Sequence, residues 1–139
     1  MARDLFHNIV KQALIKDGWT ITHDPLKIPK SVTGIKLEID LGLERIIVAE
    51  KEAEKIAVEV KSFLKASTFN EFHSVLGQYL NYLLGLKKVK SSRVLYLAMP
   101  QSAYNELSEI ALFEDAIKEY GVKLIIFEPI KETIIQWIK

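Results

Sequence analysis

Three charged residues near the middle of the chain could perform metal-dependent chemistry on a phosphate. Glu59 and Lys61 stand two residues apart in the apolar run Lys55–Phe63, and Asp40 ends an earlier alternating segment. Burying a carboxylate or an ammonium costs several kcal/mol unless it is paired. Two carboxylates can share one Mg²⁺, which prefers oxygen ligands. The ion would polarise a phosphodiester oxygen and help to generate hydroxide, while Lys61 orients that water or offsets developing charge.

The same residues also fit a purely structural interpretation. An acid two residues before a lysine is a weak motif by itself, although this chain contains it only once. Charged residues on a solvated strand face can form cross-strand ion pairs, each worth under about 1 kcal/mol. Composition and pattern alone favour this structural interpretation over a metal site.

Two predicted strands would bring the charged residues together. Gly34–Leu41 alternates apolar and polar residues, with Asp40 on the polar side. Lys55–Ser62 alternates in the same way and puts Glu59 and Lys61 on one side. Because neighbouring strands lie about 4.8 Å apart, the two carboxylates could reach one cation.

The remaining pattern predicts an α/β domain with a mixed sheet. The other predicted elements, in chain order, are a helix over Asp4–Asp17, a short strand over Trp19–Leu26, a bend or hairpin end at Gly42, a strand over Arg45–Glu50, a charged turn over Lys51–Lys55, a helix over Thr68–Leu86, a strand over Ser92–Pro100, a helix over Ser102–Tyr120 and a strand over Val122–Pro129. Glu132–Ile138 fits a strand or a last helical turn. Without the short strand over Trp19–Leu26, the order is α-β-β-β-α-β-α-β, which predicts a mixed central sheet flanked by helices.

The helix after the third strand carries two more polar candidates. Thr68 and Glu71 predict a capping box at its start. Its predicted buried stripe consists of the apolar residues Phe69, Phe72, Leu76, Leu80 and Leu83. Gln78 and Tyr82 lie one turn apart and away from that stripe. Facing a charged strand, they would suit a phosphate or a supporting role; taken alone, they fit an ordinary helix flank.

Composition narrows the class of protein. The 139 residues predict a single domain over 1–139, long enough for a substantial core. A net charge of +1 argues against a strongly basic nucleic-acid binder but allows a nuclease with a local cleft. The absence of cysteine excludes disulfides, Cys-ligated zinc and thiol catalysis. Without a secretory signal or a membrane-spanning run, we expect a cytoplasmic protein and no membrane partner.

The histidines and the densest basic run are weaker candidates. Asp4 and His7, at the start of the first helix, could line the mouth of the cleft. His23 could be a ligand or a base, although an isolated histidine is more often structural or exposed. We expect His73 to pack on the buried side of its helix. Lys87–Arg93 could contact phosphates, but a solvated helix end fits it better.

Three segments carry a resemblance to known proteins. Asp40, "EVK" at Glu59–Lys61 and "QYLNY" at Gln78–Tyr82 resemble the motifs of the PD-(D/E)xK nuclease superfamily, the last being similar to the Gln-x-x-x-Tyr helix of its RecB-like members. More closely, "DLFHNIVKQALIKDGWTITHDP", "VEVKSF" and "LGQYLNYL" resemble the XisH family, the cyanobacterial fdxN element excision controlling factors. This second resemblance extends over essentially the whole chain.

The resemblance implies a restriction-endonuclease-like core and a role for each motif residue. The implied site comprises the metal ligands Asp40, Glu59 and the backbone carbonyl of Val60, the catalytic Lys61, and the supporting residues Gln78 and Tyr82. The implied metal is Mg²⁺ or Mn²⁺. Ile39 stands where the superfamily name has proline, a position that varies widely.

The resemblance also implies a biological setting. XisH-like proteins are associated with programmed excision of a DNA element, alongside a site-specific recombinase and a small companion, XisI. The implied function is excision control through a Mg²⁺-dependent, endonuclease-like site that hydrolyses DNA phosphodiesters. The alternative is a non-catalytic accessory subunit that binds DNA or a XisI-like partner and steers the recombinase, and a third is a structural domain. A homodimer would let two clefts address both strands of a duplex.

Overall fold

The described residues form eight strands and five helices. The structure, a computed structural model, describes residues 4–47, 52–65 and 67–139. The strands in these ranges are β1 (Thr20–His23), β2 (Leu26–Ile28), β3 (Leu37–Ile39), β4 (Leu41–Ile47), β5 (Glu52–Val60), β6 (Val94–Pro100), β7 (Leu124–Glu128) and β8 (Thr133–Ile138). The helices are α1 (His7–Lys16), α2 (Lys30–Thr33), α3 (Thr68–Lys88), α4 (Gln101–Leu107) and α5 (Ala111–Tyr120).

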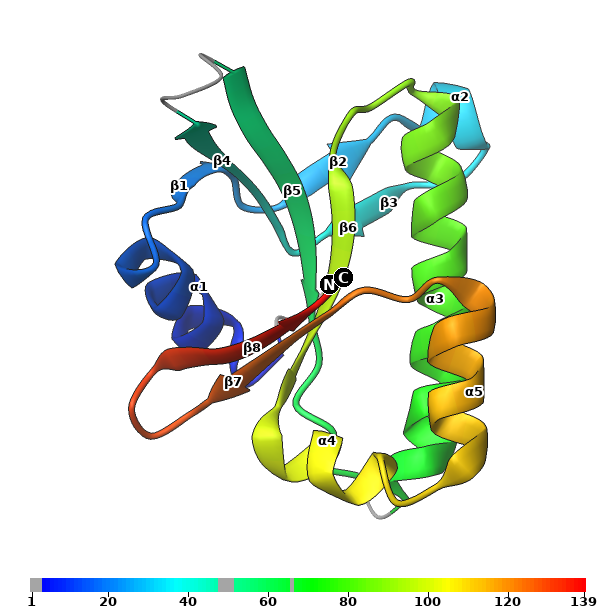
Figure 1. Ribbon diagram of the computed structural model, residues 1–139. Helices are drawn as coiled ribbons and strands as arrows, with labels where there is room; N and C mark the ends of the chain where they lie inside the picture. Colours follow the sequence, from blue (N-terminus) through cyan, green and yellow to red (C-terminus); the bar gives the residue numbers. More distant parts are fainter. Residues whose placement is uncertain (1–3, 48–51, 66) are drawn as a thin grey trace.

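A mixed sheet forms the centre of the molecule, as predicted. Its strand order is β1-β4-β5-β6-β7-β8, and β2 and β3 form a separate two-stranded sheet. The β4–β5 and β7–β8 pairs are antiparallel, whereas β5, β6 and β7 run parallel. Parallel neighbours require crossovers, which here contain α3 and then α4 with α5 (Figure 1).

Each face of the sheet has its own hydrophobic core. On one face, strand residues such as Ala57 and Leu97 pack against α3, α4 and α5. On the other, Val58 and Val60 pack with Leu14 of α1 and its neighbours. Figure 1 shows α1 and the α3–α5 layer on opposite sides of the sheet. Because β5 is covered on both faces, a charged residue on it is buried unless an opening is left beside it.

The chain changes sheets at Asp40. One strand over Gly34–Leu41 was the prediction, but β3 ends at Ile39 and β4 begins at Leu41. Ile39 packs in the core on the α3 side and Leu41 in the core on the α1 side. The predicted bend at Gly42 is wrong, since this residue lies inside β4 opposite Ala57. Asp40 is therefore the single residue between two strands of different sheets.

Several other boundaries differ from the prediction. The predicted strand over Trp19–Leu26 is two strands, β1 and β2, and α2 was not predicted. The predicted helix over Ser102–Tyr120 is interrupted between α4 and α5, and the last segment is the strand β8. β5 already begins at Glu52, inside the predicted charged turn. Residues 48–50 of one predicted strand and Lys51 of that turn lie outside the described residues.

The long helix α3 is rotated relative to the predicted stripe. Phe72 is buried as predicted, but Leu80 is 37% exposed while Tyr79 and Tyr82 are buried. The hydroxyl of Tyr79 donates to the Leu95 carbonyl (2.9 Å) and accepts from the backbone N–H of Lys123 (3.1 Å). A buried hydroxyl needs such partners, so these bonds fix the face that α3 turns toward the sheet.

The cap of α3 is also one residue earlier than predicted. Ser67 is the N-cap, and its hydroxyl accepts from the backbone N–H of Asn70. Thr68 instead donates its hydroxyl to Glu106 of α4.

Among the described residues, no helix is both long and apolar enough to cross a membrane.

Candidate functional site

A cleft opens at the carboxyl end of β5, beside the first half of α3. Its volume is about 510 Å³. Its walls include the predicted site residues Asp4, Asp40, Glu59, Val60, Lys61 and Gln78. The cleft exists because β5 ends at Val60 just where the chain passes from β3 to β4. The fold therefore gathers residues that are distant in sequence around one opening.

Asp40 and Glu59 are held together by reciprocal hydrogen bonds. The backbone N–H of Val60 donates to Oδ2 of Asp40 (2.7 Å), and the backbone N–H of Asp40 donates to Oε1 of Glu59 (3.2 Å). The Asp40 carboxylate is also close enough to Glu59 to help raise the pKa of that acid. Each acid thus uses one oxygen to bind the other segment. The second oxygen of Glu59 lies 3.4 Å from Nζ of Lys61, and that of Asp40 lies 3.8 Å from Nδ1 of His7.

Glu59 is the most perturbed acid of the cleft. Its side chain is 4% exposed. Burial, reinforced by repulsion from the Asp40 carboxylate, raises the pKa of Glu59 to about 8, although Lys61 opposes the shift. A proton or a cation shared between the two acids relieves this repulsion. Cation binding would therefore displace a proton at neutral pH.

Lys61 lies beside Glu59, on the same side of the chain. Its Nζ is 3.4 Å from Oε2 of Glu59, and its side chain is 26% exposed. The ammonium therefore remains in contact with the open part of the cleft, where an anion could approach. Lys65 and Glu71 line the cavity as well.

His7 points an unsatisfied nitrogen at the acid pair. The side chain is 3% exposed, and its Nε2 is 2.8 Å from Oδ1 of Asp24. Its Nδ1 has no hydrogen-bond partner among the described residues and lies 3.8 Å from Oδ1 of Asp40. Since a carboxylate can only accept, Nε2 is the protonated nitrogen that donates to Asp24. In the neutral ring, the lone pair of Nδ1 then faces Oδ1 of Asp40, which is also an acceptor. A cation between these two atoms would stabilise this arrangement.

Asp24 keeps the His7 ring in this orientation. Burial alone would raise the pKa of Asp24, but hydrogen bonds from Lys11 and His7 outweigh it and hold that pKa below its ordinary value. Nζ of Lys11 is 2.8 Å from Oδ2 of Asp24. The sequence did not single out Asp24 for this role, because it lies on the loop after β1 and reaches α1 only in the folded chain.

Asp4 joins the start of α1 to the end of β5. Its Oδ1 accepts from the backbone N–H of Phe6 and its Oδ2 from that of Ser62, both at 2.9 Å. Both carboxylate oxygens are thus engaged with backbone. Asp4 therefore shapes the cleft next to Lys61 and is a weaker candidate for a ligand.

Gln78 and Tyr82 bond to each other on the side of α3 that faces the cleft. Nε2 of Gln78 donates to the hydroxyl oxygen of Tyr82 (2.8 Å), and Tyr82 is 2% exposed. Burial, together with the nearby Glu59 and Asp40 carboxylates, raises the pKa of Tyr82. The phenol therefore stays protonated and can donate toward the acid pair. Tyr82 is therefore part of the core-facing surface of α3, although its type and spacing alone fitted an ordinary helix flank.

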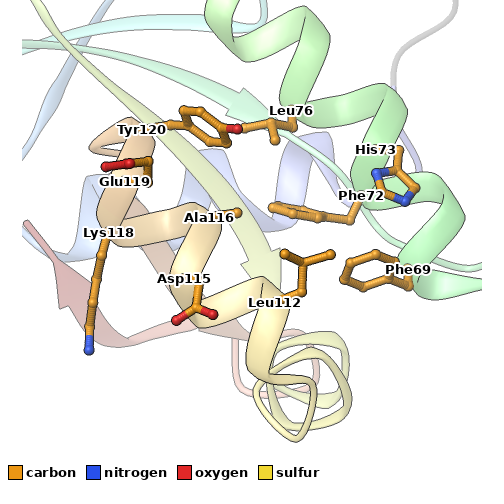
Figure 2. Close-up of a pocket in the computed structure, with 10 residues that line it drawn as sticks. All are labelled: Phe69, Phe72, His73, Leu76, Leu112, Asp115, Ala116, Lys118, Glu119 and Tyr120. Carbon is orange, nitrogen blue, oxygen red and sulfur yellow. The ribbon is translucent and has the colours of Figure 1, made fainter.

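Two histidines considered from the sequence lie elsewhere. His23 contacts Thr22 and Arg93 at the β1 edge of the sheet. His73 is exposed, against expectation, and packs edge-on to Phe69 in a second cavity of about 590 Å³ between α3 and α5. Figure 2 shows that second cavity. Its lining is mainly apolar, so the larger cavity is not where the predicted chemistry could occur.

Several groups of the cleft are of the kinds that could hold a divalent cation. Among the described residues, no three His, Asp or Glu side chains already surround one point. The donor set is instead mixed: the second oxygens of Asp40 and Glu59, the Val60 carbonyl and Nδ1 of His7. The N–H and C=O of a strand residue point to the same side, so the Val60 carbonyl faces the side of Asp40. Oxygen-rich sets with one imidazole suit Mg²⁺ or Mn²⁺.

Known proteins resemble the chain over nearly its full length. The family model described as XisH protein matches residues 1–135. The solved structure of an XisH family protein from Nostoc punctiforme PCC 73102 has a TM-score of 0.86 and 45% identity, covering 98% of this chain and 100% of that one. An fdxN element excision controlling factor protein from Anabaena variabilis has a TM-score of 0.86 and 46% identity, covering 99% and 100%. No curated protein matches. The chain belongs to the XisH family.

Proposed function

We propose that the chain is a metal-dependent deoxyribonuclease-like factor of the PD-(D/E)xK type that acts in the excision of a DNA element. The observation that carries the proposal is the pair of acids Asp40 and Glu59, joined by reciprocal hydrogen bonds through the backbone, with Glu59 buried beside Lys61. Repulsion between two neighbouring carboxylates is relieved when a cation binds between them. The similar Anabaena variabilis protein is described as an fdxN element excision controlling factor.

Each residue of the cleft would have a distinct role in phosphodiester hydrolysis. Asp40, Glu59, the Val60 carbonyl and His7 would hold Mg²⁺ or Mn²⁺. When bound, the ion would supply Lewis-acid activation of the phosphodiester and of a water molecule. Lys61, partly exposed, would orient the water or neutralise charge on the phosphorus oxygens. Tyr82 and Gln78 would support the acid pair from α3.

Isosteric removal of each carboxylate tests the proposal. Purified protein with Mg²⁺ or Mn²⁺ is incubated with supercoiled, linear duplex and single-stranded DNA. Cleavage in at least one form is expected, with a loss of about 100-fold or more in Asp40→Asn, Glu59→Gln and Lys61→Met. Glu114→Gln, on the exposed side of α5, is the matched control and should retain full activity. Cleavage that persists in Glu59→Gln would reject this site.

A non-catalytic accessory subunit is the second candidate function. It is favoured by the name of the Anabaena variabilis relative, which is a controlling factor rather than a nuclease. In that case the cleft would hold DNA or a XisI-like companion, and the chain would steer a site-specific recombinase. The protein would then cleave no DNA form with either metal, while the companion or DNA would still co-purify with it. Wild-type cleavage that depends on Glu59 would exclude this candidate.

A further inference from the structure

The outward side of α3 has an unusual composition. Five exposed residues recur there at alternating spacings of three and four, and we name them the α3 seam: Asn70, His73, Gly77, Leu80 and Leu84. None of them is Lys, Arg, Asp or Glu. A solvated helix face in a globular protein normally carries charged residues, whereas three-and-four spacing is typical of a helix that packs against another helix.

Gly77 lies at the middle of the seam. A Cβ built at this residue would meet no heavy atom within 4 Å. Glycine in a helix interior lowers helix stability relative to alanine, and here no contact within the described chain requires it. A second helix crossing at Gly77 would require it, because a missing side chain lets two backbones approach closely.

An apolar groove lies directly beside the seam. It is the cavity of about 590 Å³ between α3 and α5. In Figure 2, Leu112 and Tyr120 extend from α5 toward the α3 residues that include Leu76 and Phe69. Leu112 is 58% exposed and Tyr120 is 51% exposed. Leu80 and Leu84, which are 37% and 54% exposed, add further apolar residues on the outward side of α3. Exposed apolar residues gathered in this way mark a protein interface.

Charge is distributed unevenly along this surface. Lys87 and Lys88 are exposed at the carboxyl end of α3, whereas the exposed acids Asp115 and Glu119 flank the groove beside the amino-terminal half of α3. Lys118 also lines the groove, so this part of α5 carries two acids and one base. The surface therefore has two bases at one end and a net negative charge at the other, and these two ends are complementary in an inverted copy.

We propose that the α3 seam and the adjoining groove form the interface of a homodimer with twofold symmetry. The two α3 helices pack antiparallel and cross near Gly77 and Leu80. Leu84 of each copy enters the groove of the other, and Lys88 approaches Asp115 and Glu119. A twofold axis repeats each of these contacts, because an isologous interface uses the same surface of both copies. Antiparallel packing also opposes the two helix dipoles favourably.

DNA is a poor candidate for the occupant of this surface. Phosphate binding depends on Lys and Arg, and this surface carries Lys87 and Lys88 at one end only, with the acids Asp115 and Glu119 at the other. The cleft lies on a different side of α3, because Gln78 lines the cleft while Gly77 faces outward. A dimer through the seam would therefore leave both clefts open. The dimer proposal is independent of the nuclease proposal, and either can fail without the other.

Cross-linking tests the contact near the axis. The chain has no cysteine, so a single introduced one reports only on itself. Under mild oxidation, Leu80→Cys, which leaves Gly77 unchanged at the crossing, should form a covalent dimer rapidly at micromolar protein. Ile130→Cys, 91% exposed in the turn before β8, is the matched control and should stay monomeric in denaturing gels. Equal cross-linking of the two variants would overturn the proposed axis.

Sedimentation velocity tests the interface itself. Wild type should sediment as a dimer, and Leu84→Arg should raise the dissociation constant about tenfold or more, whereas Ile130→Arg should not. Lys88→Glu should weaken the dimer, and adding Glu119→Lys to that variant should restore it. Circular dichroism checks that each variant is folded. Wild type that is monomeric at about 200 µM, a value well above typical specific dissociation constants, would reject the proposal. If Leu84→Arg then abolished capture of a different protein, the seam would belong to that partner instead.

Discussion

Single residues in the cleft show why an acid can be kept at the end of a covered strand. Glu59 would be strongly destabilising on β5 if it were alone, because desolvation penalises its charged form. The Asp40 backbone N–H and the Lys61 ammonium compensate part of that penalty. The remaining repulsion between Glu59 and Asp40 is not compensated by the described side chains. This is the physical signature of a site whose stability depends on a proton or a cation.

The first prediction concerns stability and pH. The pKa of Glu59 rises from its ordinary value of 4.5 to about 8 in the folded chain, so the folded state binds this proton more tightly. That contribution to the free energy of unfolding is complete below about pH 4.5 and is lost as the pH rises through about 8. Glu59→Gln should therefore be more stable than wild type at pH 8.5, by on the order of 2–4 kcal/mol.

Urea unfolding of both proteins at pH 5.5 and pH 8.5, without divalent cations, measures this difference. The Glu59→Gln variant should show little change between the two pH values, apart from that shared with wild type through other groups. Mn²⁺ should stabilise wild type more at pH 8.5 than at pH 5.5, since the proton competes with the metal. Equal pH dependence in the two proteins would contradict the burial of a protonated Glu59.

The second prediction concerns His7. If Nδ1 of His7 completes the ligand set, His7→Gln should weaken Mn²⁺ binding by about 10-fold or more, as measured by calorimetry. His23→Gln, at the β1 edge, is the matched control and should bind Mn²⁺ as wild type does. Unchanged affinity in His7→Gln would leave the ring with a structural role, as the partner of Asp24.

Among the elements, α3 serves three surfaces at once. Its inner side buries Tyr79 against the sheet, and a second side presents Gln78 and Tyr82 to the cleft. Its outer side is the α3 seam. Near the carboxyl end of α3, Gly85 packs closely against Ile28 and Leu37 of the two-stranded sheet, whereas Gly77 has no atom near it. The two glycines of the helix therefore have opposite environments.

The third prediction uses these two glycines as a matched pair. Gly77→Ala should raise the stability of the monomer by about 0.5–1 kcal/mol, because alanine is the better helix former and the added methyl group meets nothing. Gly85→Ala should lower it by about 1 kcal/mol, because its Cβ would lie 2.9 Å from Cδ1 of Ile28. Chemical denaturation at a protein concentration below the dimer dissociation constant separates these effects. Stabilisation in both variants would show that the contact at Gly85 is easily relieved.

At the scale of the whole molecule, Arg93 ties the strands at one end of the sheet. Its side chain is 9% exposed. Nη1 donates to the carbonyls of Leu43 (3.0 Å) and Ile56 (2.9 Å), and Nη2 donates to the hydroxyl of Thr22 (3.1 Å). One guanidinium thus connects β1, β4 and β5 at the start of β6. The carboxyl end of β5 holds the cleft, so the alignment of these strands also sets the position of Glu59.

The fourth prediction is that Arg93→Lys destabilises the fold. A lysine ammonium cannot reproduce the planar fork that bonds to two carbonyls and a hydroxyl, and unpaired buried carbonyls are unfavourable. The free energy of unfolding should fall by about 1–3 kcal/mol in urea titrations. Arg45→Lys, at a 41%-exposed pair with Glu54, is the matched control and should cost under about 1 kcal/mol. Equal losses would mean that Arg93 acts through charge alone.

Sequence patterns predicted the elements that depend on local spacing. The alternation around Glu59, the long helix with Gln78 and Tyr82, and the mixed character of the sheet all follow from periods of two and 3.6 residues. The predicted ends of helices were less accurate, because a single capping residue sets where a helix begins. At the start of α3, the cap is Ser67 and not Thr68. Four residues of the predicted stripe on α3 pack in the core, and only Leu80 does not. The sequence missed the buried tyrosines, of which Tyr79 is held by bonds of its hydroxyl to residues distant in the chain.

The sequence by itself determined which residues could perform the chemistry: Asp40, Glu59, Lys61 and the Gln78–Tyr82 pair, whose types and spacing are local properties. Only the tertiary structure decided that the chain changes sheets at Asp40, that Asp24 turns His7 toward the acids, and that Gly77 faces outward with nothing near it. These features depend on contacts between residues far apart in the chain. Such contacts are selected by the packing of two cores around one sheet, and no local period encodes them.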